Sequence, residues 1–321
     1  MKTKITTLTI ALFGWIVFNS NTKPTPDNLN GNISISGAFA LYPITVKWAE
    51  EFRKIHPNVK IDISAGGAGK GITDVLSKVT DIGLVSRDLN IAEVKKGAFP
   101  IAVTKDAVIP TTSSSNPFLS QLKERGIKKD EFNNIFITGK IRSWNQLGFK
   151  SAAPIHVYTR SDAAGAAETW AKYFGKKQED LLGVAVYGDP GLATAVKKDP
   201  SAIGFNNIVY IYDSKTKRAT NGVSVLPIDL NKNGKIDPEE NFYDTVDDLI
   251  AAIAAGKYPS PPARDLYFVT NGRPQNPIVV EFTKWVLTEG QKYVHEAGYI
   301  NLPQDKLTVE LGRLGTGAGI K

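Results

Sequence analysis

Two arginines in this sequence have the chemistry and the position to bind an anion. Arg87 follows the apolar run Ile82–Val85, and Arg160 stands just after the run Ile155–Tyr158. A guanidinium can donate two parallel hydrogen bonds to a carboxylate or phosphate, so either arginine suits an oxyanion. Each could equally form an ion pair on the surface, and their spacing alone leaves that choice open.

Three loops rich in glycine or alanine provide further candidates for anion binding. They cover residues 36–43, 66–71 and 160–166, and each joins an apolar run to a helical pattern. The first turn of a helix has N–H groups without acceptors and the positive end of the helix dipole, which together attract anions. Such loops are also common as plain turns. The second is not a Walker loop, because Gly71 stands where serine or threonine is needed.

A separate pattern, at residues 229–240, is typical of a calcium-binding loop. It matches the twelve-residue EF-hand loop, with oxygen ligands at positions 1, 3, 5, 9 and 12, glycine at 6 and a backbone carbonyl at 7. The expected ligands are Asp229, Asn231, Asn233, Lys235, Asp237 and Glu240. Because a strand precedes the loop where an EF-hand has a helix, we interpret it as a structural calcium site. A chance match in an asparagine-rich turn is the alternative.

Strand-like and helix-like segments alternate along the chain and would position these loops. The expected strands cover residues 32–36, 59–63, 82–85, 101–109, 155–158, 223–228 and 266–269. The expected helices cover residues 44–55, 72–79, 166–174, 242–255 and 278–294. Residues 111–117 read as a crossover between domains. The alternation predicts an α/β fold with mainly parallel sheets flanked by helices, which binds ligands beyond the carboxyl ends of its strands.

From about residue 33 to residue 302, the chain resembles the phosphate-binding proteins of ABC transporters. Loops 36–43 and 66–72 resemble the two ligand loops of that family. The other motifs that match in order are residues 81–87, 135–144, 199–205, 290–294 and 298–299. The resemblance implies a two-lobed periplasmic-binding-protein fold of type II. It also implies an exported protein that captures an oxyanion, with phosphate as the first expectation, in a cleft between the lobes and delivers it to a membrane permease.

The resemblance further implies where the lobes and the ligand residues lie. Lobe I would comprise residues 31–112 and 264–321, and lobe II residues 113–263 with the calcium-type loop. The implied ligand residues are Leu41, Tyr42, Ala68, Gly69, Ser86, Arg87, Arg160, Ala164, Gly165 and Ala166. Backbone N–H groups of Leu41, Tyr42 and Ala68 would point to the ligand from lobe I, and Arg160 would face them from lobe II.

Four of these positions depart from the pattern of the family. Hydroxyl side chains are usual at positions 41, 68, 164 and 166, where this sequence has one leucine and three alanines. Each lost hydrogen bond to a charged ligand would remove about 1.5–3 kcal/mol of binding free energy. The ligand is therefore left open between phosphate, another oxyanion and an anionic group of a larger molecule bound by a surface protein.

The amino-terminal residues are typical of an export signal. Residues 1–20 combine Lys2 and Lys4 with an apolar run at 5–18, which is short for a membrane span. Phe18 suits cleavage after Ser20 poorly, so an uncleaved anchor is the alternative. A flexible lead-in is expected at residues 21–30. We therefore expect a periplasmic or otherwise extracytoplasmic protein.

The composition narrows the classes of function. The 321 residues contain no cysteine, which excludes a disulfide framework, a cysteine–zinc site and a lipid-linked cysteine. The net charge of +7, or +5 without Lys2 and Lys4, comes from scattered residues, so nucleic acid is not expected as a partner.

We expect a monomeric binding protein that is not an enzyme. None of the three histidines lies in the glycine loops, and neither an HExxH nor a GxSxG pattern occurs. The enzyme alternative is an exported phosphate-ester hydrolase that uses the calcium-type loop as its metal site.

Overall fold

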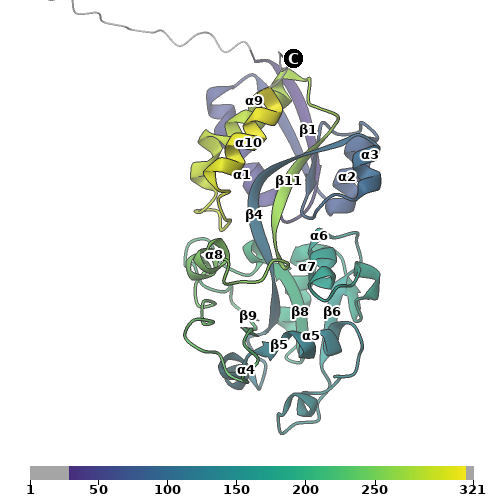
Figure 1. The fold of residues 1–321 in the computed structure, drawn as a ribbon, viewed down its shortest axis with the longest axis vertical. Helices are drawn as coiled ribbons and strands as arrows, with labels where there is room; N and C mark the ends of the chain where they lie inside the picture. Colours follow the sequence, from purple (N-terminus) through teal and green to yellow (C-terminus); the bar gives the residue numbers. More distant parts are fainter. Residues whose placement is uncertain (1–28, 316–321) are drawn as a thin grey trace, which may run out of the picture.

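Two lobes joined by two long strands make up the computed structural model, which describes residues 29–315 (Figure 1). The predicted export signal at 1–20 and residues 21–28 of the predicted lead-in lie outside the described residues. No helix within residues 29–315 is long and apolar enough to cross a bilayer. The predicted two-lobed α/β fold is confirmed.

Lobe I contains the amino-terminal strands and the carboxyl-terminal helices. Its strands are β1 (Gly31–Gly37), β2 (Val59–Ala65), β3 (Ile82–Val85), and the outer parts of β4 (Ala98–Ser113) and β11 (Ala263–Asn271). Its helices are α1 (Tyr42–Ile55), α2 (Ala68–Leu76), α3 (Ile91–Lys95), α9 (Pro277–Leu287), η4 (Glu289–Tyr293) and α10 (Gln304–Gly315).

Lobe II is formed by the chain between the two long strands. Its strands are β5 (Ile127–Lys128), β6 (His156–Arg160), β7 (Val184–Val186), β8 (Ala202–Asn207), β9 (Val223–Val225) and β10 (Ile228–Asp229). Its α-helices are α4 (Leu119–Arg125), α5 (Lys129–Phe136), α6 (Gly165–Tyr173), α7 (Gly188–Lys198) and α8 (Val246–Ala254). Its short 3-10 helices are η1 (Trp144–Leu147), η2 (Gln178–Asp180) and η3 (Ile208–Tyr210).

The long strands β4 and β11 tie the two lobes into one continuous sheet. The strand order is β2-β1-β3-β11-β4-β8-β6-β7, with β9 beside β4. Strands β1 to β3 are parallel, as are β6 to β8, whereas β11 and β4 run antiparallel to their neighbours. The 16 residues of β4 reach about 50 Å at ~3.3 Å per residue, which is enough to cross both lobes.

Each lobe has its own hydrophobic core, and the cores divide within β4. Val103 packs in the core of lobe I, whereas Ala107 packs in that of lobe II. The boundary between the lobes therefore lies between Val103 and Ala107, earlier than the predicted boundary after residue 112. The predicted crossover at 111–117 is wrong in its first part, because Thr111–Ser113 remain strand and pair with β8 and β9.

Helix ends differ from the predictions at two places that matter for packing. α2 begins at Ala68, not at residue 72, because β2 ends at Ala65 and the next two N–H groups donate to the Gly37 carbonyl. The predicted helix at 278–294 stops at Leu287 and continues as η4. The backbone at Thr288 leaves the helical region there, and the Gly290 carbonyl accepts a hydrogen bond from Trp48.

We predict that Phe136→Ala lowers the free energy of unfolding by about 3–5 kcal/mol. The Phe136 ring is fully buried and lies 5.5 Å from the Trp170 ring and 5.8 Å from the Phe205 ring, so its loss leaves a cavity. Urea denaturation followed by tryptophan fluorescence measures the change. The exposed Val184 is the control, and Val184→Ala should change stability by less than about 0.5 kcal/mol. Equal effects of the two variants would contradict this description of the core.

Candidate functional site

The predicted anion loops meet where the two lobes touch. The Gly69 N–H of lobe I donates to the Ala163 carbonyl of lobe II at 3.0 Å. A Cβ atom on Gly165 would lie 2.3 Å from the Ser86 hydroxyl, so glycine is required for this close approach. We call this contact between the second and third loops the seam.

The predicted ligand residues of all three loops lie at helix starts. Leu41 immediately precedes α1, and Tyr42 is the first residue of that helix. Ala68 and Gly69 lie in the first turn of α2, which begins earlier than predicted. Ala164 precedes α6, and Gly165 and Ala166 are its first two residues. The first turns of three helices therefore lie at these loops.

The predicted donation of Leu41 and Tyr42 to a ligand is wrong for this structure, because their N–H groups donate to carbonyls of the first loop, at Ala38 and Phe39. The Ala164 N–H likewise donates to Gln178 Oε1 at 3.0 Å.

The four positions without hydroxyl groups are packed as core. Leu41 and Ala68 belong to the core of lobe I, and Ala164 and Ala166 to that of lobe II. Their side chains offer no hydrogen-bond donor, and the backbone N–H groups of Leu41 and Ala164 already donate to Ala38 and Gln178. Ser86 is buried and keeps a hydroxyl group at the seam.

Arg160 is held by two carboxylates. Its Nε and Nη2 atoms donate to Asp162 at 2.9 and 2.6 Å, and Nη1 donates to Asp189 at 2.5 Å. Arg160 is only 4% exposed, and its guanidinium lies 5.5 Å from the centre of the Phe39 ring. A guanidinium has five N–H donors, so these three hydrogen bonds leave two that the carboxylates do not take.

The electrostatics of Arg160 favour a permanent positive charge. Burial alone would lower its pKa, but Asp189 and Asp162 outweigh burial and raise the pKa above its ordinary value. Removing either carboxylate would leave a buried charge with less compensation, which is costly. Arg160 is therefore fixed both in charge and in orientation.

Arg87 forms one ion pair within lobe I and one across to lobe II. Nη1 and Nη2 donate to Glu93 at 2.9 and 2.7 Å, and Nε lies 2.8 Å from Glu168 of lobe II. Burial would raise the pKa of Glu93, but Arg87 lowers it overall; at Glu168 burial outweighs Arg87 and the pKa is raised. The role of Arg87 as a ligand of an oxyanion remains a prediction, since four of its five N–H groups already have acceptors.

A lysine-rich opening lies along the seam. It has a volume of about 360 Å³ and is lined from lobe I by Gly69 and Arg87. Lobe II contributes Ala163, Glu168, Gln178, Glu179 and the lysines Lys172, Lys176 and Lys177. Four basic side chains in this lining outnumber two acidic ones. The opening therefore attracts small anions toward the seam.

Four polar residues beyond the predicted set connect Arg160 to the strands that join the lobes. Asp189 accepts a hydrogen bond from the Asn207 amide at 2.7 Å, and Asn207 accepts one from Arg264. Arg264 on β11 in turn donates to Asp106 on β4 at 2.9 Å. Asp106, an acid within a strongly apolar strand, is the one member of this network that the sequence could have indicated.

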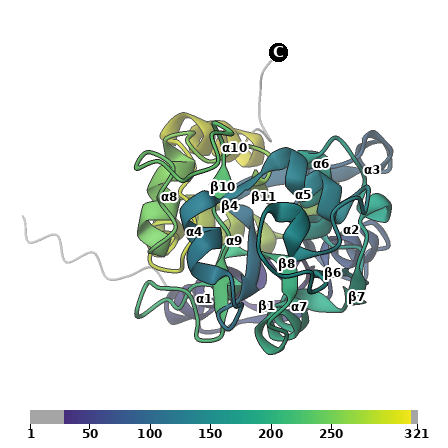
Figure 2. The same cartoon turned by 90° about the horizontal axis from the view of Figure 1, so that it is seen from below.

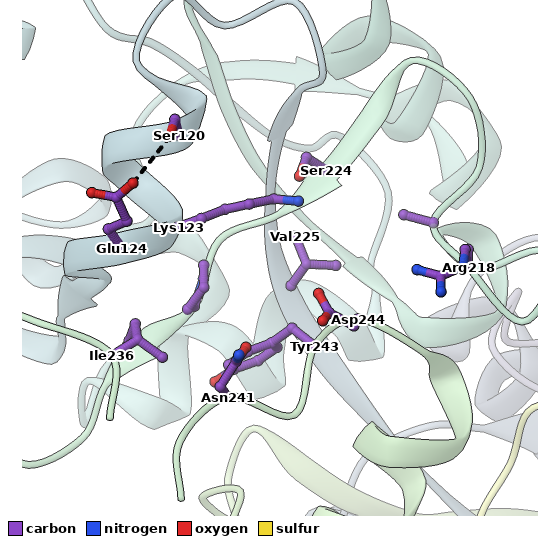
Figure 3. A pocket seen from close by; sticks show the side chains of 12 residues that line it. Ser120, Lys123, Glu124, Arg218, Ser224, Val225, Ile236, Asn241, Tyr243 and Asp244 are labelled. Atoms are coloured by element: carbon purple, nitrogen blue, oxygen red, sulfur yellow. Dashed lines mark hydrogen bonds between the residues drawn. The ribbon is translucent and has the colours of Figure 1, made fainter. Parts of the chain in front are cut away.

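The predicted calcium-type loop lies elsewhere, between β10 and α8 in lobe II. Beside it is a cavity of about 550 Å³ (Figure 3). Lys123 and Glu124 of α4, Arg218 and Asp244 line the cavity, and Ile236 contributes from the loop. Figure 3 shows Lys123 extending between α4 and the strand that carries Ser224 and Val225. Because both signs of charge are balanced here, this cavity does not have the lysine-rich character of the seam.

Comparisons with known proteins agree with the geometry. A model of the PBP superfamily domain matches residues 22–289. The phosphate-binding protein PstS of Methanocaldococcus jannaschii is 27% identical over 348 residues, covering 92% of this chain and 89% of that protein. PstS of Bacillus subtilis is 28% identical over 294 residues, covering 90% and 87%.

A solved structure supports the same fold. A putative phosphate ABC transporter substrate-binding protein of Clostridium perfringens, solved with bound phosphate, has a TM-score of 0.70 and 24% identity. The match covers 85% of this chain and 100% of that one. At this identity the likeness establishes the two-lobed fold.

We predict that Glu168→Gln loosens the seam. Loss of the ion pair with Arg87 removes an interaction worth about 0.2–1 kcal/mol, because Glu168 is partly exposed. Hydrogen exchange of the Gly69 amide, which bonds across the seam, should accelerate by up to about fivefold. The control is Glu179→Gln, an exposed acid that lines the same opening. Unchanged exchange at Gly69 in the Glu168 variant would show that the ion pair does not hold the lobes together.

Proposed function

The chain belongs to the PBP superfamily, and from this membership we propose that it captures phosphate between its two lobes and passes it to an ABC transporter. The observation that carries the proposal is the environment of Arg160. This buried guanidinium keeps its charge, retains two N–H donors that the carboxylates do not take and lies on Phe39 of the first loop. The first turns of α2 and α6 would complete the site with backbone N–H groups.

The relatives support phosphate as the ligand. The proteins of Methanocaldococcus jannaschii and Bacillus subtilis are described as phosphate-binding proteins, and each aligns with about nine-tenths of this chain. The Clostridium perfringens structure contains phosphate within the same fold. The lysines around the seam opening fit this assignment, since they would attract an anion from solution.

Export and delivery complete the proposal. Residues 1–20 would direct the chain out of the cytoplasm. Outside the cytoplasm it would act as a monomer that captures its solute. A membrane permease would then receive the anion when the lobes separate. The second candidate is binding of another oxyanion, which the four missing hydroxyl groups at the seam favour.

Calorimetric titration with phosphate, sulfate, molybdate and tungstate tests the assignment. We expect saturable binding of phosphate and a loss of at least about tenfold in affinity in Arg160→Lys, because an ammonium cannot reproduce the two-pronged donation of a guanidinium. Arg160→Ala should abolish binding. The exposed Arg218, far from the seam, is the matched control, and Arg218→Lys should bind as the unchanged protein does.

Each other outcome of these titrations has a clear meaning. If sulfate, molybdate or tungstate bound more tightly than phosphate, that oxyanion would be assigned as the ligand instead of phosphate. No response to any of the four would contradict the proposal and favour a surface protein with a larger anionic ligand. Release of phosphate from a simple ester would instead indicate the hydrolase considered from the sequence.

Restoring hydroxyl groups should strengthen phosphate binding. Ala164→Ser and Ala166→Thr each place a donor at the first turn of α6, and a hydrogen bond to a charged ligand contributes about 1.5–3 kcal/mol. We therefore predict that each substitution lowers the Kd for phosphate by about tenfold or more. Ala193→Ser on α7 is the control and should leave Kd unchanged. Equal Kd values in all three variants would mean that the anion does not contact α6.

A further inference from the structure

The calcium-type loop contains a carboxylate oxygen that the protein does not satisfy. Asp229 is 1% exposed, and its Oδ2 accepts a hydrogen bond from the Gly234 N–H inside the loop at 2.8 Å. Its Oδ1 is buried and has no hydrogen-bond partner among the described residues. A buried carboxylate oxygen without a donor is costly, so this position calls for a cation.

A second buried carboxylate oxygen without a hydrogen bond, in Asp247, has a simpler explanation. The Asp247 side chain is 45% exposed, and this oxygen lies 3.8 Å from the Lys217 ammonium. Solvent and that lysine can compensate its charge. Asp229 is only 1% exposed, so solvent cannot compensate its charge in the same way.

The two asparagines of the loop present further oxygen atoms. Asn231 Oδ1 accepts one hydrogen bond, from the Asn233 N–H at 3.0 Å, and Asn233 Oδ1 accepts one from the Lys235 N–H at 3.0 Å. An amide oxygen has two lone pairs, so each keeps one for a metal. Both amide nitrogens donate to Asp237 Oδ2, which draws the third and fifth positions of the loop toward the ninth.

The carboxylate of Glu240 is held by backbone N–H groups of the loop in this structure. Glu240 is buried, and its carboxylate accepts hydrogen bonds from the N–H groups of Leu230, Asn231 and Asp237 at 2.8, 2.9 and 3.2 Å. In residues 29–315 no group of three or more His, Cys, Asp or Glu side chains converges well enough to hold a metal alone. A metal here would therefore use the amide and backbone oxygens and would turn Glu240 inward.

The loop is anchored to the far end of lobe II. The Ile236 N–H donates to the Glu124 carbonyl at 2.7 Å, and the Ile236 side chain covers Gly126. Strand β10, which leads into the loop, pairs with β5. Figure 1 shows β5 together with α4 and α5 at the end of the lobe away from lobe I, and Figure 2, seen from below, shows α4 and α5 in front.

We propose that residues 229–240 bind one calcium ion through Asp229, Asn231, Asn233, the Lys235 carbonyl, Asp237 and Glu240, and that this ion braces the distal end of lobe II. Six or more oxygen ligands in a flexible loop suit Ca²⁺, whereas Mg²⁺ requires a tighter octahedron. Ile236 and Asn241 line the cavity of Figure 3, so the bound ion would also fix that wall of the cavity.

Calcium titration of the chelator-treated full chain tests the proposal. Saturable Ca²⁺ binding should appear in calorimetry, and at about 100 times Kd it should raise Tm by about 4 °C. The same concentration of Mg²⁺ should have less than half of this effect. Glu240→Gln should weaken binding of Ca²⁺ by at least about tenfold, and Asp229→Asn should abolish it.

The neighbouring Glu239 gives a matched control, because it is exposed and outside the proposed ligand set. Glu239→Gln should bind Ca²⁺ as the unchanged chain does. The proposal would be overturned if the unchanged chain did not bind Ca²⁺. It would also be overturned if the Asp229 and Glu240 variants bound Ca²⁺ as tightly as the unchanged chain does. The test is independent of phosphate, so its failure leaves the proposed function of the seam unaffected.

Discussion

The burial of one guanidinium at the meeting point of two lobes is the constraint on which this structure depends. Arg160 can leave water only because Asp162 and Asp189 accept its hydrogen bonds, and breaking such a buried pair costs about 3–5 kcal/mol. Asp189 stays in place because Asn207 donates to it, and Asn207 is tied to Arg264 on β11. The end of β6, the start of α7 and the strand that joins the lobes are therefore positioned by one connected polar network.

This network also limits how the seam can bind an anion. Arg160 contributes one positive charge and its two carboxylate partners contribute two negative charges, so side chains at its centre do not attract an anion by net charge. Attraction must come from the lysines at the opening and from the first turns of the helices. Because positions 41, 68, 164 and 166 lack hydroxyl groups, the geometry of backbone N–H groups would then determine which oxyanion fits.

Patterns in the sequence predicted the α/β alternation, most strands and five of the ten α-helices within residues 29–315, whereas the two lobes and their facing loops were implied by the family resemblance. Local periodicity and glycine placement carry the information on the alternation, as α1 and the loop before α2 illustrate. It did not reveal that β4 crosses both lobes, because pairing with β8 depends on residues about 100 positions away. It also did not reveal Asp189 as a partner of Arg160. Twenty-nine residues separate them, and only the fold brings them together.

Strand pairing and packed aromatic rings connect the calcium-type loop to the helix α6 at the seam. β10 pairs with β5 at Ile228 and Ile127, and α5 follows β5 directly. From α5, the rings of Phe132 and Phe136 pack on Trp170 at 5.4 and 5.5 Å. Trp170 lies in α6, the helix whose first turn is at the seam. A cation that stiffens the loop would therefore stabilise the same hydrophobic platform that holds α6, because close-packed cores transmit strain. The buried loop residue Asp229 and helix α6 thus lie at opposite ends of lobe II, and the same hydrophobic core holds both in place.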